Sequence, residues 1–418
     1  MLLIKNGQLY TGAMQDILID DGKIVEIADC IGESSDVCVI DAQGLIVAPG
    51  LVDMHVHFRD PGFEYKEDIY TGAAAAAAGG VTTVLCMPNT KPVADNSDTI
   101  KYIIDKATDT PISVFPCAAV TVGQKGTELT DFVALKAAGA IALSDDGYPI
   151  QNAALVREAM QKARDLDMLI ISHCEDADLV QNHGVNEGEV SKKLGTSGRP
   201  AIAEEIMVAR DVMLAAETGA RVHIAHVSTA GSVDIIRRAK KSGVRVTAET
   251  APQYFILTED EILKQGSHAR VNPPLRTKAD VEGIIQGLID GTIDVIATDH
   301  APHSDEEKSL PITEAMSGLI GLETSLSLTL TYLHHQGKLE ISEIVKLMTE
   351  NPAKILGLSV GRLEIGSQAD IIAFDPNEKW TVEPSLFKSK ARNTPFAGVK
   401  LQGKVKYTLS KGKIIHVS

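Results

Sequence analysis

Short apolar segments alternate with amphipathic ones through the middle of the chain. The segments between the apolar runs, such as 152–167 and 202–219, place apolar residues at spacings of three and four. Those spacings are typical of helices, and short fully apolar runs are typical of buried strands. The predicted strands cover residues 51–57, 81–87, 112–120, 140–144, 168–173, 221–227, 244–250 and 294–300. Eight strands alternating with helices predict an α/β fold, a TIM-like (β/α)8 barrel.

The two ends of the chain have a different pattern. Residues 1 to about 48, and those after about 360, contain strand-like runs separated by turn dipeptides such as Asn-Gly and Asp-Gly. Neither end could bury its strands alone, so we expect both to build one small composite β domain. The expected organisation is an N-terminal β part at 1–50, a barrel at 51–358 and a C-terminal β part at 359–418. The alanine run at 73–78 predicts a small-residue helix packed closely on the sheet.

Composition narrows the class of protein. Hydrophobic residues at 44% and charged residues at 23% describe an ordinary globular chain. The net charge of −16 argues against nucleic acid or an anionic membrane surface as the main partner. Five scattered cysteines without a Cys-x-x-Cys pair favour a reducing, cytoplasmic location. No apolar run is long enough for a membrane span, and the polar N-terminus predicts no signal peptide.

Candidate metal ligands fall at the ends of the predicted strands. In the stretch GLVDMHVHFRDPG, His55 and His57 stand two residues apart and so share one face of a strand. Strand ends converge on the C-terminal rim of a barrel, where barrel active sites lie. The others at strand ends are Asp145, Asp146, His173, His226 and Asp299. This set of nitrogen and oxygen ligands suits Zn²⁺, with Mn²⁺, Co²⁺ or Fe²⁺ as alternatives.

The remaining histidines are sorted by setting. His223 precedes the end of its strand and is expected to be structural. His300 and His303, in TDHAPH, are open between loop contacts and substrate contacts. Surface positions are expected for His183, His268, His334, His335 and His416.

Seven ordered motifs resemble those of the dihydroorotase family in its bacterial class I form, within the amidohydrolase superfamily. They are GLVDMHVHFRDPG, MPNT at 87–90, SDDG at 144–147, SHCED at 172–176, HVSTA at 226–230, NPPLR at 272–276 and ATDHAPH at 297–303. The resemblance spans nearly the whole chain and also implies a barrel with a flanking composite β domain.

The resemblance implies a centre of two zinc ions. His55, His57 and Asp299 would bind one ion, His173 and His226 the other, and Asp146 would bridge them. Many relatives, including dihydropyrimidinases and allantoinases, use a carboxylated lysine as the bridge, but AGAIALSDDG at 138–147 contains no lysine. Spacing alone leaves Asp145 and Asp146 open as the bridge, and the resemblance favours Asp146.

The resemblance also implies a substrate site. Arg59, Asn89 and His303 would hold a substrate carboxylate, Asn272 would contact the ring, and His57 is counted among the substrate contacts. Ser317 and Gly318 would offer backbone groups. Ser317 stands where relatives often have an aromatic residue, so the packing there is uncertain from sequence. The polar stretch HSDEEKSLP at 303–311 predicts a mobile loop over the site.

The implied activity is the reversible interconversion of N-carbamoyl-L-aspartate and L-dihydroorotate in pyrimidine (UMP) synthesis. A metal ion lowers the pKa of water and so supplies hydroxide, and Asp299 would act as general acid and base. The alternatives are a dihydropyrimidinase or allantoinase, or a non-catalytic homologue that binds aspartate transcarbamoylase. A homodimer is expected, with possible association with that transcarbamoylase.

Overall fold

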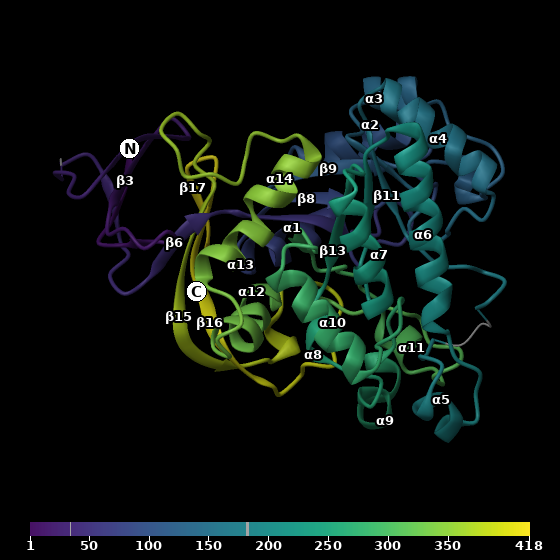
Figure 1. Cartoon of the computed structure of the whole chain (residues 1–418). Coiled ribbons are helices and arrows are strands. Elements are labelled where there is room, and N and C mark those ends of the chain that lie inside the picture. The colour runs from purple at the N-terminus through teal and green to yellow at the C-terminus, as the bar shows by residue number, and fades with distance from the viewer. Residues whose placement is uncertain (34, 181–183) are drawn as a thin grey trace.

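An eight-stranded parallel sheet forms the centre of the molecule (Figure 1). The computed structural model describes residues 1–33, 35–180 and 184–418. The strands follow chain order from one side of the sheet to the other: β7 (Leu51–Val56), β8 (Val81–Cys86), β9 (Ser113–Ala118), β10 (Ala142–Ser144), β11 (Leu169–Ser172), β12 (Val222–Ile224), β13 (Val246–Thr250) and β14 (Val295–Ile296). Val56 forms a parallel bridge with His300, and His57 N donates to His300 O at 2.9 Å. These contacts join the last strand region to the first, so the predicted barrel is confirmed.

Two predicted strands end earlier than the apolar pattern suggests. β12 ends at Ile224 and β14 at Ile296, although their apolar runs continue to 227 and 300. His226 and Asp299 have φ angles of 34° and 49°, which no extended strand accommodates. The chain therefore leaves the sheet just where the candidate ligands lie.

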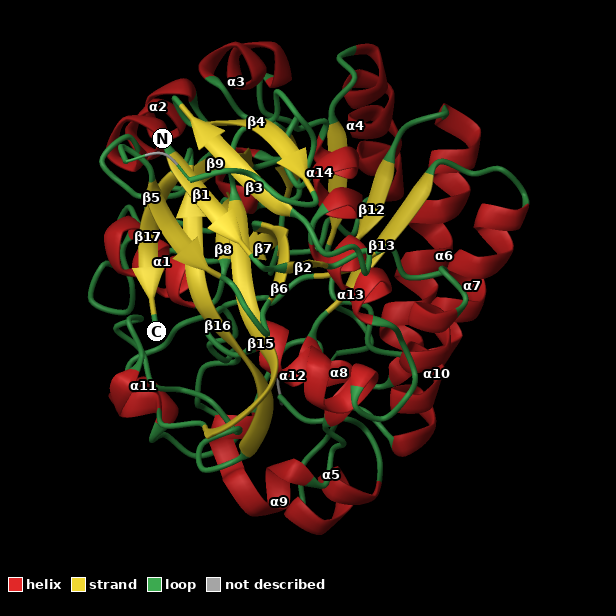
Figure 2. Cartoon of the chain, turned by 90° about the vertical axis from the view of Figure 1, so that its left-hand side faces the viewer, coloured by secondary structure: helices red, strands yellow, loops and turns green. Residues whose placement is uncertain are grey.

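Helices surround the barrel (Figures 1 and 2). The longer ones are α1 (Ile69–Ala78), α2 (Ser97–Ala107), α3 (Phe132–Ala138), α4 (Ala153–Asp165), α6 (Ala201–Thr218), α7 (Ala230–Lys241), α10 (Lys278–Ile289), α13 (Ile341–Met348) and α14 (Glu350–Leu356). Shorter ones are α5 (Glu189–Leu194), α8 (Pro252–Ile256), α9 (Glu261–Gln265), α11 (Asp305–Lys308) and α12 (Ser325–Thr329), with helical turns at Val122–Gln124, Gly266–Ala269, Leu330–His334 and Pro384–Leu386. No helix in the described ranges is long and apolar enough to cross a membrane.

The alanine run forms helix α1, as predicted. Asp68 caps its first turn by accepting from Thr71 N at 2.8 Å. The small residues let the helix lie close to the first barrel strand: a Cβ added at Gly72 would stand 2.5 Å from the ring of Phe58. Phe58 directly follows His57, so this contact supports the strand exit that carries the candidate ligands.

Both termini contribute to a separate β region. The first sheet, β4-β3-β1-β5, is built from β1 (Leu2–Lys5), β3 (Asp16–Asp20), β4 (Lys23–Ala28) and β5 (Cys38–Asp41). The second, β17-β16-β15-β6-β2, mixes β2 (Gln8–Leu9) and β6 (Ile46–Pro49) with β15 (Ile371–Thr381), β16 (Lys400–Ser410) and β17 (Lys413–Val417). Figure 1 shows the purple and yellow ends of the chain side by side. The composite β region is therefore confirmed.

Gly50 alone separates β6 from β7, and α14 ends at Leu356. We propose domain boundaries near residues 50 and 358 on this basis. One segment of the C-terminal part reaches the barrel rim, because Asn393 Oδ1 accepts from His303 N at 3.1 Å.

Four of the histidines expected at the surface are not buried. His268 and His335 are exposed, and His334 and His416 are half-buried. His183 lies outside the described residues.

Candidate metal centre

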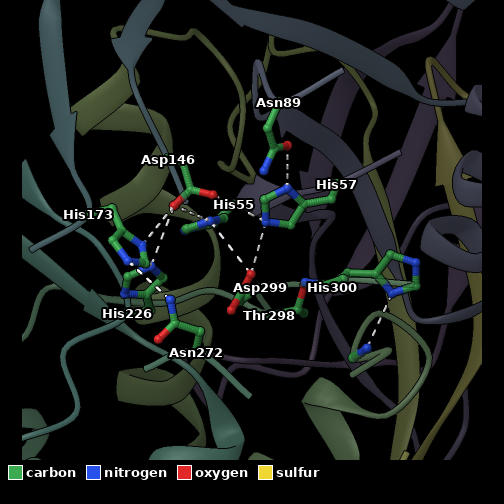
Figure 3. A network of polar contacts seen from close by, with 12 residues as sticks. His55, His57, Asn89, Asp146, His173, His226, Asn272, Thr298, Asp299 and His300 are labelled. Carbon is green, nitrogen blue, oxygen red and sulfur yellow. Dashed lines mark hydrogen bonds and ion pairs between the residues drawn. The ribbon is translucent and has the colours of Figure 1, made fainter. Parts of the chain in front are cut away.

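Five barrel strands bring the predicted ligands to one place (Figure 3). His55 lies in β7 and His57 directly after it, while the others follow the ends of β10, β11, β12 and β14: Asp146, His173, His226 and Asp299. All six side chains are buried, and His55 is 0% exposed. The convergence follows from the shared direction of the parallel strands.

Three residues of the site have left-handed backbone conformations. Arg59, His226 and Asp299 have φ angles of 61°, 34° and 49°. Non-glycine residues rarely adopt such angles, and the cost is tolerated where the surrounding structure holds a functional side chain in place. The sharp turns aim all three side chains into the space above the barrel.

Asp146 lies at the centre of the cluster. Its Oδ1 is 3.4 Å from His55 Nε2, 3.4 Å from His173 Nδ1 and 3.5 Å from His226 Nε2. Its other oxygen is 3.5 Å from His57 Nε2. The carboxylate thus faces both predicted ligand groups.

Asp145 faces away from the cluster. Its Oδ1 accepts from Val120 N at 2.8 Å and Thr121 N at 3.1 Å, and its Oδ2 accepts from the Thr121 hydroxyl. These bonds tie the end of β10 to the segment after β9. The geometry thus separates two aspartates that the sequence left open, and favours Asp146 as the bridging group.

The donor atoms of the cluster fit a metal ion. Within the described ranges, one ligand atom from each of His55, His57 and Asp299 lies within 4.8 Å of the others, and so do those of His55, Asp146 and His226. His55 Nδ1 lies 2.5 Å from Glu249 Oε1, and His57 Nδ1 lies 2.8 Å from Asn89 Oδ1. When each Nδ1 carries the proton for these bonds, each Nε2 turns a lone pair toward carboxylate oxygen. Imidazole nitrogens and carboxylate oxygens that converge in this way could hold a metal ion.

The charges of the cluster act on one another. Burial alone would raise the pKa of Asp146, but the histidines around it hold that pKa well below its usual range. Burial opposes a charge on His55, yet Asp146 and Glu249 raise the pKa of its ring well above the ordinary value. The carboxylates therefore demand positive charge in this space.

The cluster opens into a cavity of about 770 Å³. Every predicted metal or substrate residue except His55 lines it: His57, Arg59, Asn89, Asp146, His173, His226, Asn272, Asp299, His303, Ser317 and Gly318. The structure thus brings the predicted substrate residues and ligands together around a single space. Arg199 and Arg270, which the sequence did not single out, also line it.

Arg59 lies in this cavity and contacts a backbone carbonyl and an imidazole ring. Its Nε donates to Pro302 O at 3.2 Å, and its Nη2 lies 3.3 Å from His303 Nε2. In the described part of the chain no carboxylate oxygen lies within 4.0 Å of its guanidinium. Burial lowers the pKa of Arg59. This side chain is therefore a half-buried cation, not a solvated surface charge.

His303 belongs to the cavity wall. Its Nε2 lies 2.9 Å from Ser317 O, and its Nδ1 faces Lys66 Nζ at 3.4 Å and Glu307 Oε2 at 3.3 Å. Burial lowers the pKa of its ring to about 3, with help from the charges of Arg59, Lys66 and Lys308 against the opposing hydrogen bond to Glu307. The ring is therefore neutral at ordinary pH.

Asn272 and Ser317 have defined partners in the cavity. Asn272 Nδ2 lies 3.4 Å from His173 Nε2, and Asn272 Oδ1 accepts from Arg199. Ser317 Oγ accepts from Arg270 Nε at 3.2 Å. The Ser317 hydroxyl, whose packing the sequence left open, is therefore paired with a guanidinium.

His300 turns out to make loop contacts. Its Nδ1 accepts from Gly321 N at 3.2 Å, and its Nε2 lies 3.5 Å from Glu67 Oε2. Figure 3 shows its ring apart from the cluster around Asp146.

Glu249 is a site residue that the sequence reading missed. Its second oxygen lies 3.3 Å from His223 Nε2, and His223 Nδ1 lies 2.8 Å from Thr247 Oγ1. His223 is thus structural, as expected, and acts behind the cluster. The signal in the sequence was the position of Glu249 near the end of the strand-like run VRVTAET, because polar residues at strand ends are expected at the barrel rim.

Comparisons with known proteins give the family of the chain. The Dihydro-orotase-like family matches residues 44–232, and the Amidohydrolase family matches residues 285–416. A dihydroorotase of Acetivibrio thermocellus is 50% identical over 99% of this chain and 98% of its own length. One of Ruminiclostridium cellulolyticum is 52% identical over 98% of this chain and 97% of its own.

Solved structures of the same fold include cyclic amide hydrolases. An L-hydantoinase (dihydropyrimidinase) from Arthrobacter aurescens has a TM-score of 0.90 at 26% identity, covering 100% of this chain and 97% of its own. A D-hydantoinase (dihydropyrimidinase) from a Thermus species has a TM-score of 0.86 at 26% identity, and the match covers 99% of this chain and 95% of the hydantoinase chain. Because dihydroorotases are about 50% identical to it over nearly its full length, the chain belongs to the dihydroorotase family of the amidohydrolase superfamily.

Proposed function

We propose that the chain is a zinc-dependent dihydroorotase that interconverts L-dihydroorotate and N-carbamoyl-L-aspartate in pyrimidine synthesis. Family membership makes it a cyclic amide hydrolase with a small-molecule substrate. The observation that carries the substrate assignment is Arg59, which lines the same cavity as the ligand cluster and has no carboxylate partner among the described residues. Dihydroorotate and carbamoyl-aspartate both carry the carboxylate that this side chain can bind bidentately.

The cluster would hold two zinc ions. His55, His57 and Asp299 would bind one, His173 and His226 the other, and Asp146 would lie between them. What supports this assignment is the convergence of lone pairs on two adjoining groups of ligand atoms. Bound zinc would polarise the ring carbonyl and activate water at neutral pH.

Asp299 would move the proton. Its Oδ1 lies 3.1 Å from His57 Nε2, and its side chain lines the cavity. In hydrolysis, the carboxylate would accept a proton from the attacking water and deliver it to the ring nitrogen as the C–N bond breaks. In the reverse direction it would take the proton from the ureido nitrogen as the ring closes.

The other wall residues would orient the substrate. Asn89 and His303 would join Arg59 at the carboxylate, and Asn272 would contact the ring. Ser317 and Gly318 would present backbone groups. All of these residues line the cavity. His303 and Asn272 also contact neighbouring residues of the cavity wall, Ser317 O and His173 Nε2.

A hydantoinase-like or allantoinase-like specificity is disfavoured. Those enzymes are expected to bridge their metals with a lysine. The nearest lysine upstream of Asp146 is Lys136, which donates to Leu166 O outside the barrel and so cannot bridge metals. A non-catalytic homologue is disfavoured as well, because the six candidate ligands are all present and buried together.

We also propose a homodimer and a cytoplasmic location. Support for self-association comes from apolar side chains on one face of α6, where Ile202 is 47%, Ile206 44% and Met213 72% exposed. The five unpaired cysteines support a reducing compartment. Association with aspartate transcarbamoylase stays a prediction, which co-purification would test.

The function is tested by assaying purified protein with N-carbamoyl-L-aspartate, L-dihydroorotate, hydantoin and allantoin, together with metal analysis. We expect turnover of the first two only, and about two zinc ions per chain. Asp299→Ala should abolish turnover. Activity confined to the uncharged ureides would contradict the proposal.

A further inference from the structure

Lys308 is a buried cation outside the ligand cluster. Its side chain is 1% exposed, and its Nζ donates to Arg270 O at 3.2 Å, Met316 O at 3.0 Å and Gly318 O at 3.0 Å. Within the described ranges, no carboxylate oxygen lies within 4.0 Å of this ammonium. A buried charge without a counter-charge is costly. We therefore expect Lys308 to have a role that an apolar side chain could not fill, namely donation to three backbone carbonyls.

The carbonyls belong to the cavity wall. Residues 313–318 line the cavity, and Gly318 N donates to Arg270 O at 2.9 Å. Arg270 holds the same segment through Ser317 Oγ at 3.2 Å and through Ile312 O. Three acceptors match the three N–H groups of an ammonium, whereas a neutral amine has two N–H groups and could donate to only two of these carbonyls. Burial and the neighbouring Arg270 lower the pKa of Lys308 to about 7, which is the cost of this arrangement.

The segment in turn sets the position of His303. Ser317 O lies 2.9 Å from His303 Nε2, the nitrogen that lies 3.3 Å from Arg59 Nη2. Gly318 has a φ of 144°, and a Cβ there would stand 3.1 Å from His303 Cδ2. A shift of this backbone would therefore move the histidine ring relative to the guanidinium.

We propose that Lys308 is a positioning residue for the substrate carboxylate. Its ammonium fixes the carbonyl of Met316 and, together with Asn393 Nδ2, that of Gly318, and so holds Ser317 and the His303 ring beside Arg59. The inference rests on the proposed function, because the carboxylate at Arg59 belongs to it. Lys308 itself does not touch the substrate.

The first test is Lys308→Met, which keeps an unbranched side chain one atom shorter and removes all three donors. We expect KM for dihydroorotate to rise about tenfold, with kcat changed less than about threefold and zinc content unchanged. Backbone amides of 316–318 should exchange hydrogen faster than in the parent protein. Lys162→Met is the matched control, since Lys162 is 52% exposed and forms a surface ion pair with Glu158.

A double-mutant cycle separates positioning from general stability. If Lys308 acts through His303 and Arg59, Lys308→Met should raise KM less than about threefold in an Arg59→Met background. Equal effects in both backgrounds, or an unchanged KM in the single variant, would overturn the proposal.

Two further outcomes are distinguishable. If Lys308→Met does not fold, Lys308→Gln supplies two N–H donors, and its KM should lie between parent and the tenfold value; a parental KM would overturn the proposal. If the parent protein does not act on dihydroorotate, the proposed function fails. Hydrogen exchange tests the anchoring role of Lys308 independently of activity. Unchanged exchange of the amides of 316–318 in Lys308→Met or Lys308→Gln would contradict that role whether or not the protein acts on dihydroorotate.

Discussion

Glu249 Oε1 lies 2.5 Å from His55 Nδ1, and Glu249 Oε2 lies 3.3 Å from His223 Nε2. The carboxylate is 1% exposed, and burial alone would raise its pKa, but His55 and His223 hold that pKa well below the usual range. It therefore accepts from His55 as an anion and keeps the lone pair of His55 Nε2 directed at Asp146 and Asp299. A carboxylate behind a metal-binding histidine orients the ring and raises its basicity.

Glu249→Gln should weaken zinc binding by about 10–100-fold, because the amide cannot fix the His55 tautomer with the same charge. Competition with a chelator measures this affinity directly. Glu282→Gln, at an exposed position of α10, is the control. Parental zinc affinity in Glu249→Gln would show that Glu249 serves only the packing.

Arg59→Met should raise KM for dihydroorotate by roughly 10–100-fold, since it removes charge-assisted hydrogen bonds to the substrate carboxylate. Zinc content should not change. Steady-state kinetics with metal analysis check both parts, and Arg157→Met, at a side chain that is 49% exposed, is the control. Loss of zinc from Arg59→Met would mean that the residue supports the metal instead.

The His303 ring should remain neutral from pH 7 to pH 5. Its folded pKa of about 3 lies below the ordinary 6.5, so the unfolded chain binds a proton in this range that the folded chain does not. The folded state therefore loses stability from this group as the pH falls below about 6.5. NMR of labelled histidine gives the midpoint, and a His303 titration between pH 6 and 7 would refute the assignment.

Gly72→Ala should destabilise the fold by about 1–3 kcal/mol. Alanine ordinarily favours a helix interior over glycine, but here its Cβ would stand 2.5 Å from the Phe58 ring. Denaturant unfolding measures the difference. Gly32→Ala is the control, because no described atom beyond its two chain neighbours lies within 4 Å of the added Cβ. Unchanged or increased stability of Gly72→Ala would show that Phe58 moves aside freely.

The sequence predicted the barrel and the ligand cluster because both follow from local patterns. Apolar runs mark the strands, and parallel strands bring their ends together, so His55, His173 and Asp299 could be placed in one cluster without any contact information. The ends of the strands were predicted less well. β12 and β14 are short since His226 and Asp299 turn the chain sharply, and a left-handed conformation leaves no signal in hydrophobicity.

Contacts across long stretches of chain could not be predicted. Asn393, from the C-terminal part, binds both Ala301 O and His303 N, some 90 residues away in sequence. The stretch HSDEEKSLP was expected to be a mobile loop because its residues are polar. Instead, residues 305–308 form α11, capped by Ser304, and Lys308 is buried beneath the cavity wall. The polar composition of this stretch predicted exposure to solvent. Lys308 is buried because carbonyls from two other segments of the chain accept its hydrogen bonds, and such contacts cannot be predicted from local composition.

We propose that this cluster and Arg59 together make a zinc-dependent dihydroorotase. The most direct measurement is cyclisation of N-carbamoyl-L-aspartate by the protein before and after chelation, and again after zinc is restored. We predict that activity disappears with the metal and returns with zinc, and that hydantoin is not hydrolysed in any of these states. Full activity in the chelated protein, or turnover of hydantoin but not of carbamoyl-aspartate, would contradict the claim.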